Sequence, residues 1–394
     1  MKLKGLIRKI ERCIARKTCC TMWILIFAIT MLILTIFMGS CRISEFRNSY
    51  MKSYMIDYMT PSHCYCKFGS KSYSMCYSSP FNSELFGEKF NCSFLEFLNG
   101  ADLLEPQNYL DLSEDDLEET PIVSAASENH AKENMEMLYH IRKFWPDQKV
   151  ILYDLGLKPK TRKEFQSFCN VELRKFPFDK FPPYVRNLKE YRWKPLLIAM
   201  VMMDFSSIFY MDSSIRWNKP EMDSYLDMLR CKNKNYAAIN STTCMESEFL
   251  LLSNTSHGIY TSTDPRMYKF LPTELEKIKE PEEVQACFAL IVKTLDTIDI
   301  LKWWVLCALE NECMAPANSG SSLKCKFGED KYRDEPVCHR FDQAAINILL
   351  ANKFNFDETS YFPNYTSPFL VDRHASEKYN HRILRECRNY LSKS

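Results

Sequence analysis

The sequence predicts an α/β domain with a mostly parallel sheet, and three observations lead to this class. Apolar runs of strand length alternate with helical stretches from Ile122 onward, which is the pattern of βαβ units. One such run, residues 207–211, stops abruptly at Asp212. Another, residues 149–155, carries Asp154 near its end. Because ligands bind outside the carboxyl ends of parallel strands, we expect both acids at one functional edge of the sheet.

The individual elements follow from local patterns. The segment 149–155 (KVILYDL) is a nearly continuous apolar run, typical of a buried strand, whereas 171–178 alternates like a half-buried one. Trp145-Pro146-Asp147 ends the first helix, because proline cannot continue it. The predicted strands are 122–126, 149–155, 171–178, 207–211 and 236–239. The predicted helices are 130–144, 161–169, 193–203, 281–309 and 341–353.

Composition excludes several classes of protein. The chain has 394 residues, enough for one large domain or two modest ones. Its 51 Lys and Arg nearly balance 50 Asp and Glu, so no bulk charge attracts nucleic acid. It has only 9 glycines and no glycine-rich phosphate-binding motif, which disfavours a classical dinucleotide fold and a P-loop NTPase.

The N-terminus predicts a membrane anchor. Residues 21–39 carry no charge and are about long enough to cross a bilayer. Seven Lys and Arg and one acid precede them, which predicts a cytosolic N-terminus. A cleaved signal peptide is the alternative, although its apolar region is usually only about 7–15 residues. The short span favours an early secretory membrane. We therefore predict a single-pass type II protein of the Golgi or endoplasmic reticulum, with a luminal C-terminus.

The predicted organisation follows from this topology and from changes in pattern. It consists of a cytosolic tail (1–20), a transmembrane signal anchor (21–39), a cysteine-containing stem (40–118), a luminal domain (119–378) and a C-terminal tail (379–394).

Cysteines and glycosylation motifs agree with a luminal position. Of 17 cysteines, 14 follow the predicted span, which predicts disulfides in an oxidising compartment. The His63-Cys64-Tyr65-Cys66 cluster could instead bind zinc. Four Asn-x-Ser/Thr motifs also lie beyond the span, at Asn91, Asn240, Asn254 and Asn364.

The acids at the strand ends have two interpretations each. Asp212, with hydroxyl or water ligands, could hold Mg²⁺ or Mn²⁺ at a diphosphate, or it could close the strand in an Asx turn. Asp154 could bind a ribose hydroxyl or cap the following turn. Lys194 could offset diphosphate charge, although it also stands where a helix begins and could face solvent.

Two segments carry a resemblance to the GT-A class of type II Golgi glycosyltransferases. In those enzymes a Trp-Lys or related helix precedes a hydrophobic strand ending in Asp-x-Asp, which holds Mn²⁺ against the donor diphosphate. This chain resembles them in Trp193-Lys194-Pro195 and in the strand ending Met211-Asp212-Ser213-Ser214, with Ser214 in place of the second acid. The segment 341–347 (FDQAAIN) resembles a helix start of many such transferases.

The resemblance implies roles for particular residues. Asp342 would lie near the acceptor as a base or sugar-orienting acid, whereas its alternative is a helix N-cap. His374 would be a further metal ligand, whereas its alternative is an exposed histidine. Asp154, Lys194, Asp212 and Ser214 would contact the nucleotide sugar, and Asp212 and His374 would hold Mn²⁺.

A narrower resemblance covers residues of roughly 120–375. They are similar to an uncharacterised family of nematode and insect membrane proteins with a domain of unknown function. The resemblance is carried by Tyr153-Asp154-Leu155-Gly156-Leu157, Phe176-Pro177-Phe178, Tyr191-Arg192-Trp193-Lys194-Pro195 and Met211-Asp212-Ser213-Ser214. It supports the fold and topology more than any chemistry.

These observations predict a transferase that moves a sugar from a nucleotide sugar to a luminal glycan or protein. The first alternative is a non-catalytic glycan- or protein-binding module, which the missing second acid favours. A methyltransferase is a second alternative, suggested by Asp154-Leu155-Gly156 but disfavoured by the scarcity of glycine. A disulfide-rich cell-surface interaction protein is the third.

Overall fold

A computed structural model describes residues 60–80, 82–117, 119–237, 244–319, 325–363, 367–374 and 381–385. The chain divides after Thr60 into two units, and the elements below belong to the second, Pro61–Ser394. The predicted membrane span, 21–39, lies outside the described residues. Among the residues that are described, no helix combines the length and the apolar character needed to cross a membrane.

The elements are short and numerous. The strands are β1 (Tyr65–Phe68), β2 (Lys71–Ser74), β3 (Ser78–Ser79), β4 (Asn82–Phe86), β5 (Ile122–Ala126), β6 (Val150–Asp154), β7 (Val171–Lys175), β8 (Ser207–Met211), β9 (Ile215–Trp217), β10 (Phe249–Leu251), β11 (Asn254–Gly258), β12 (Glu282–Val284), β13 (Phe288–Val292) and β14 (Phe369–Val371). The α-helices are α2 (Leu95–Gly100), α3 (Ala131–Phe144), α4 (Pro159–Gln166), α5 (Trp193–Val201), α6 (Asp223–Arg230), α7 (Lys234–Ala237), α8 (Leu295–Leu309), α9 (Asn311–Met314), α10 (Phe341–Lys353) and α11 (His381–Arg385).

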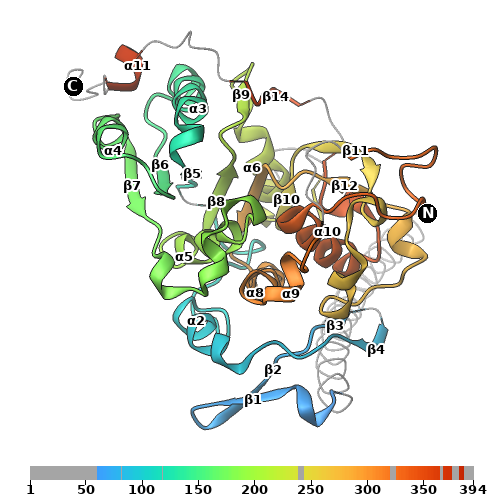
Figure 1. Cartoon of the computed structure of the whole chain (residues 1–394). Helices are drawn as coiled ribbons and strands as arrows, with labels where there is room; N and C mark the ends of the chain where they lie inside the picture. The colour runs from blue at the N-terminus through green and yellow to red at the C-terminus, as the bar shows by residue number, and fades with distance from the viewer. Residues whose placement is uncertain are drawn as a thin grey trace, which may run out of the picture. The chain divides into compact units, whose positions relative to one another are not determined.

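A six-stranded sheet organises the domain, in the order β10-β13-β8-β5-β6-β7 (Figure 1). β5 is parallel to β6 and β8, and β6 is parallel to β7. β13 is antiparallel to both β8 and β10. The chain thus runs outward from β5 to β7 and then returns to place β8 on the other side of β5. The order of strands reverses between β5 and β8, and such a reversal leaves a crevice for ligands at the carboxyl ends.

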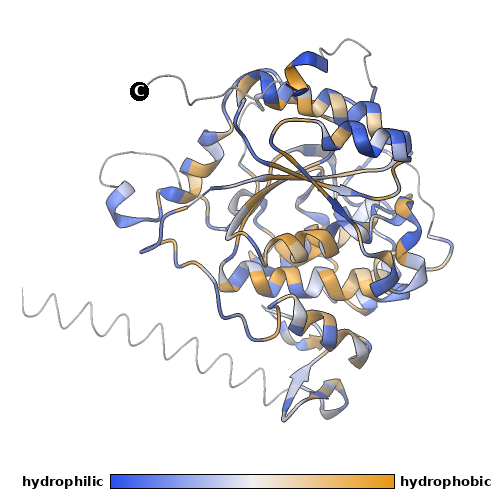
Figure 2. Cartoon of the chain, turned by 90° about the vertical axis from the view of Figure 1, so that its left-hand side faces the viewer, coloured by the Kyte–Doolittle hydropathy of each residue, from blue (hydrophilic) through white to orange (hydrophobic). Residues whose placement is uncertain are grey.

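Two helical layers cover the sheet, because successive strand residues point to opposite faces. On β8, Ile208 and Tyr210 pack in the cluster that contains α5, α8 and α10, whereas Phe209 and Met211 pack in the cluster that contains α3 and α6. Figure 2 shows the hydrophobic colour concentrated in the strands and in the helices beneath them. Burial on both faces explains why these strands read as continuous apolar runs.

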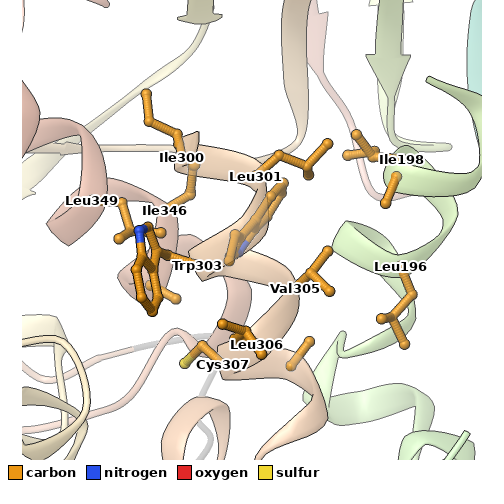
Figure 3. Close-up of a cluster of buried hydrophobic side chains, with 14 of the residues drawn as sticks. Leu196, Ile198, Ile300, Leu301, Trp303, Val305, Leu306, Cys307, Ile346 and Leu349 are labelled. Carbon is orange, nitrogen blue, oxygen red and sulfur yellow. The ribbon is translucent and has the colours of Figure 1, made fainter. Parts of the chain in front are cut away.

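Helix α8 lies at the centre of the first layer. Its apolar side chains lie between those of α5 and those of α10 (Figure 3). Trp304, also on α8, donates its indole N–H to the backbone oxygen of Asp342 at 3.0 Å. This contact fixes the start of α10 against α8.

Two disulfides stabilise the segment before the sheet, and aromatic packing joins this segment to the domain. Cys64–Cys76 and Cys66–Cys92 are bonded, and Phe90 packs 6.1 Å from Trp303 of α8 between ring centroids. From Pro61 on, the predicted stem therefore contributes to the same core as the sheet. Cys231–Cys244, Cys307–Cys313 and Cys325–Cys338 are also bonded.

The zinc alternative at the His63–Cys66 cluster is wrong for this oxidised form. In the described part of the chain, His63, Cys64 and Cys76 are the one group with metal-ligand spacing, but the two cysteines bond to each other. Of the predicted glycosylation sites, Asn91 and Asn254 are exposed, while Asn240 and Asn364 lie outside the described residues. Their modification stays a prediction.

Most predicted elements are confirmed within a few residues, and two are wrong. The predicted strand 236–239 begins inside helix α7. The predicted helix 281–309 contains β12 and β13 before α8 begins at Leu295. β13 (FALIV) is apolar on both faces because it is a central strand, so its sequence shows no period that would distinguish it from a buried helix.

A buried arginine connects the end of α8 to the start of α5. The Arg192 guanidinium lies 2.6 Å from the Glu190 carboxylate and donates to the backbone oxygens of Glu310 and Asn311, both at 2.7 Å. These oxygens follow the C-terminus of α8, where the helix dipole favours a cation. Arg192 thereby positions the first turn of α5.

We expect Arg192→Leu to lower the free energy of unfolding by about 3 kcal/mol, because it leaves buried carbonyl groups and Glu190 without a donor. The half-exposed pair of Arg230 and Asp227 offers a matched control, and Arg230→Leu should cost less than about 1 kcal/mol. Urea unfolding of both variants measures the difference. Equal losses would show that Arg192 contributes no more than a surface ion pair.

Candidate functional site

Asp212 immediately follows β8, beside the crevice between β5 and β8. Its backbone N–H donates to the carbonyl oxygen of Cys287 on the neighbouring segment before β13 at 2.7 Å, which fixes the end of the strand. Its carboxylate accepts a hydrogen bond from the Tyr210 hydroxyl at 2.5 Å. The side chain is still 27% exposed. Asp212 is therefore oriented by the protein and open to a ligand.

Lys194, in the first turn of α5, lies behind Asp212. Its side chain is 3% exposed, so the alternative of a solvent-facing lysine is wrong. The ammonium nitrogen lies 2.6 Å from Asp342 Oδ2 and 3.6 Å from Asp212 Oδ1, and it donates to the Ala286 carbonyl oxygen at 3.0 Å. Burial alone would lower the pKa of Lys194, but the two carboxylates raise it above its usual value. Lys194 is therefore charged.

Asp342 lies in the first turn of α10 and completes the cluster. The N-cap residue of α10 is Arg340, so the N-cap alternative for Asp342 is wrong. Burial raises the pKa of Asp342 to about 6, although the Lys194 ammonium acts in the opposite direction. Asp342 is thus mostly ionised at neutral pH and accepts a proton below it. We call Lys194, Asp212 and Asp342 the acid–lysine cluster.

Two strained aromatic residues flank the acid–lysine cluster. Tyr191 and Phe341 have positive φ angles, 54° and 43°, which bulky side chains rarely adopt. Their ring centroids lie 6.4 Å apart. Each lies within three residues of a charged member of the cluster, Lys194 or Asp342. Strain of this kind gathers at functional sites, where the surrounding structure maintains it.

Asp154 has a structural role in its turn. Its Oδ1 accepts hydrogen bonds from the N–H groups of Gly156 and Leu157, at 2.8 and 2.7 Å, and Arg162 lies 2.6 Å from Oδ2. Gly156 has φ of +129°, a conformation that favours glycine. The turn-capping interpretation is therefore confirmed, and contact with a ribose stays a prediction.

Ser214 and His374 are brought to this edge by the pairing of β9 with β14. Ser214 is buried, and its backbone oxygen accepts a hydrogen bond from the Asp372 N–H at 2.7 Å. His374, two residues further on, is 98% exposed, and its Nδ1 lies 3.5 Å from the Asp372 carboxylate. The pairing brings the His374 segment to the turn after Asp212, whereas the Ser214 backbone is held within the protein. Metal binding by His374 stays a prediction.

Sequence reasoning missed a second buried acid. Glu283, on β12, accepts a hydrogen bond from Gln343 Nε2 at 2.7 Å, one residue after Asp342. Burial raises the pKa of Glu283 to about 8. The misassigned helix over 281–309 hid this residue, since on such a helix it would be an ordinary surface acid. Tyr210 was likewise interpreted only as part of an apolar strand.

Comparison with known proteins gives a family match and remote structural similarities. Residues 62–199 match a family described as protein of unknown function (DUF1647). No curated protein matches the chain.

Solved structures that are similar to the chain include glycosyltransferases. The galactosyltransferase LgtC with donor and acceptor sugar analogues is 14% identical, with a TM-score of 0.32 over 58% of this chain and 70% of that one. An active-site mutant of LgtC is 14% identical, with a TM-score of 0.26 over 47% of this chain and 59% of that one. The bifunctional glycosyltransferase WbbM, in its apo form, is 12% identical, with a TM-score of 0.31 over 62% of this chain and 38% of that one. Similarity of this extent says nothing of the activity of this chain.

We expect Lys194→Met to destabilise the fold by about 3–5 kcal/mol, because it leaves two carboxylates without a buried cation. The loss should be larger at pH 8 than at pH 5. Without Lys194 the pKa of Asp342 rises further above about 6, so the variant continues to lose stability as pH increases, after the wild type has levelled off. Urea unfolding at both pH values measures this.

The double variant Lys194→Met with Asp342→Asn serves as the control. It should recover much of the stability at pH 8, because the neutral amide needs no cation. If Lys194→Met lowered the free energy of unfolding equally at pH 5 and pH 8, this result would contradict the electrostatic explanation.

Proposed function

We propose that the chain is a glycosyltransferase that moves a sugar from a nucleotide sugar to a hydroxyl of a glycan or protein. The observation that carries the proposal is the acid–lysine cluster at the β5–β8 crevice. It combines a partly exposed carboxylate, a buried ammonium and a carboxyl group whose pKa is about 6. Such a set suits a reaction that needs both charge stabilisation and a base.

We assign each residue a role in this reaction. Asp342 would take the proton of the acceptor hydroxyl as its oxygen bonds to the anomeric carbon of the donor. The bond from that carbon to the diphosphate breaks, and the nucleoside diphosphate leaves with the electron pair. Lys194 would hold Asp342 in place, and Arg373, which is exposed and follows β14, would offset the developing phosphate charge. The rate should fall as the pH drops below about 6, because Asp342 then holds a proton.

The types of side chain at this edge, a carboxylate and an imidazole, are ones that bind Mn²⁺. Asp212 offers a partly exposed carboxylate, and the strand pairing that joins Asp372 to Ser214 brings the segment that carries exposed His374 to the turn after Asp212. A divalent ion at a diphosphate completes its shell with phosphate oxygens and water. When bound, the ion would offset the charge of the leaving diphosphate. Asp212 and His374 would hold it, and Ser214 would contribute little because it is buried.

We further propose that the protein is a type II membrane protein of the Golgi or endoplasmic reticulum, with this domain in the lumen. The uncharged segment 21–39 with the basic residues before it supports an anchor. Disulfides such as Cys64–Cys76 and Cys307–Cys313 are typical of an oxidising compartment.

A non-catalytic binding module is the second candidate. It is favoured by Ser214, a buried residue where the resemblance places the second metal-binding acid. Such a module would bind a nucleotide sugar, with or without Mn²⁺, and release no nucleotide.

We expect Asp212→Asn to abolish both Mn²⁺-dependent donor binding and nucleotide release. The test measures the thermal stability of the full chain with a panel of nucleotide sugars, with and without Mn²⁺. A donor at a hundredfold its dissociation constant adds about 2.7 kcal/mol. Nucleotide release is then measured with the donor that binds.

Asp204→Asn is the matched control, because Asp204 is 52% exposed and precedes β8 at its opposite end. It should leave binding and turnover unchanged. Retained turnover in Asp212→Asn would refute the assigned role, and binding without turnover in the wild type would favour the binding module.

A further inference from the structure

A second pocket opens at the same edge of the sheet, at the carboxyl ends of β6 and β7. Its volume is about 250 Å³. Three cationic side chains line it, Arg162, Lys175 and Arg186, together with the rings of Phe176 and Phe178. They come from α4, β7 and the segment that leads to α5, so the pocket is assembled by the fold rather than by one helix.

The cations of this pocket exceed its anions. Asp154 is the one acid among the lining residues, and hydrogen bonds with Arg162, Gly156 and Leu157 already occupy both of its oxygens. Burial would raise the pKa of Asp154, but these donors lower it below its usual value, so it stays ionised and compensates Arg162. Lys175 and Arg186 are exposed and form no ion pair with any residue that the structure describes. Two positive charges therefore remain for a ligand.

The surrounding chain adds to this charge. Residues 158–189 carry nine Lys and Arg against three Asp and Glu, a net charge of +6, whereas the whole chain has +1. The positive charge is thus concentrated in the segment that supplies all three cations of the pocket. Such a concentration raises the local density of anionic ligands and their rate of association.

One wall of the pocket is aromatic and ordered. The Arg186 guanidinium lies 5.4 Å from the centroid of the Phe178 ring, which packs 4.6 Å from the centroid of buried Phe176. A cation–π contact of this kind restrains the guanidinium before a ligand arrives. Phe178 is half-buried and lines the pocket, and an aromatic ring there also suits the apolar face of a sugar or a base.

We infer that this pocket binds a phosphate or sulfate ester on a sugar or nucleoside. Its oxygens would accept hydrogen bonds from Lys175 and Arg186, and the ring that carries the ester would lie against Phe178. β5 separates β6 from β8, so the pocket lies about two strand spacings, or roughly 10 Å, from the end of β8. If the proposed function holds, the ester belongs either to an acidic acceptor glycan or to the donor nucleotide.

The test measures binding to the full chain by fluorescence anisotropy. One probe is a labelled hexasaccharide with a sulfate ester, compared with its unsulfated counterpart, and the other is uridine 5′-phosphate as competitor. We expect the sulfated probe to bind at least tenfold more tightly than the unsulfated one. Lys175→Gln and Arg186→Gln should each weaken binding about tenfold, the size of one charge-assisted hydrogen bond.

Lys163→Gln is the control, because Lys163 is exposed on α4, next to Arg162 in the chain, but does not line the pocket. It removes the same charge and should change binding less than twofold. All three substituted residues are exposed, so we expect each variant to unfold at the same thermal midpoint as the wild type. Equal midpoints would show that the fold is intact. Equal weakening in all three variants, or no preference for the sulfated probe and no displacement by the nucleotide, would overturn the inference.

These measurements also distinguish the two sources of the ester. In addition, they distinguish failure of the proposed transferase from failure of the pocket inference. Tighter binding of the sulfated probe identifies an acidic glycan, and equal binding of the two hexasaccharides that uridine phosphate displaces identifies the nucleotide; either outcome supports the pocket. Pocket binding without nucleotide release would refute the transferase and leave this inference standing. Nucleotide release that depends on Asp212 but not on Lys175 or Arg186, with no binding of either probe, would support the transferase and refute this inference.

Discussion

The buried ammonium of Lys194 is the interaction on which the geometry of the crevice depends. It lies 2.6 Å from Asp342 and 3.6 Å from Asp212, and so connects the start of α5, the end of β8 and the start of α10. A buried charge is costly to hold without partners, so each of the three elements is fixed in place by the other two. The free-energy cost of desolvating Lys194 is therefore offset only when these three elements hold one defined arrangement at the sheet edge.

Two neighbours of Lys194 maintain this arrangement. Arg192 ties the first turn of α5 to the end of α8, and Trp304 of α8 binds the backbone of Asp342. The strain at Tyr191 and Phe341 is the local cost of turning the chain sharply into α5 and α10. Helix α8 is the common support, which explains why it lies in the centre of the layer. The first layer is therefore built around the crevice rather than beside it.

The sequence predicts the fold well where the period is clear and fails where burial erases it. The βα units from Ile122 to Met211 are confirmed because their strands and helices differ in length and are separated by Pro and Asp. The helix predicted over β13 was wrong, because a central strand that is buried on both faces has no polar side to reveal its period. The strand predicted at 236–239 rested on propensity alone, which tertiary context overrides in a segment as short as α7.

The site was predictable in its members and not in their contacts. Asp212, Lys194 and Asp342 were each proposed from a motif, but the ion pairs among them join residues up to 148 positions apart, from Lys194 to Asp342. Neither spacing nor period encodes such a contact. Asp154 shows the same limit in reverse, since its place at a strand end suggests a ligand, while the turn after it uses both of its oxygens.

Charge is distributed unevenly along the edge of the sheet that carries the acid–lysine cluster and the pocket. This distribution would set the orientation of a bound ligand. The acid–lysine cluster has two carboxylates for one ammonium, so it carries a net negative charge when Asp342 is ionised. The pocket beyond β6 has three cations for one carboxylate. A ligand with an anionic ester at one end and a hydroxyl at the other would place the ester in the pocket, because the reverse orientation sets like charges against each other. If both proposals hold, the same edge would discriminate between the two ends of its ligand before any sugar-specific contact is made.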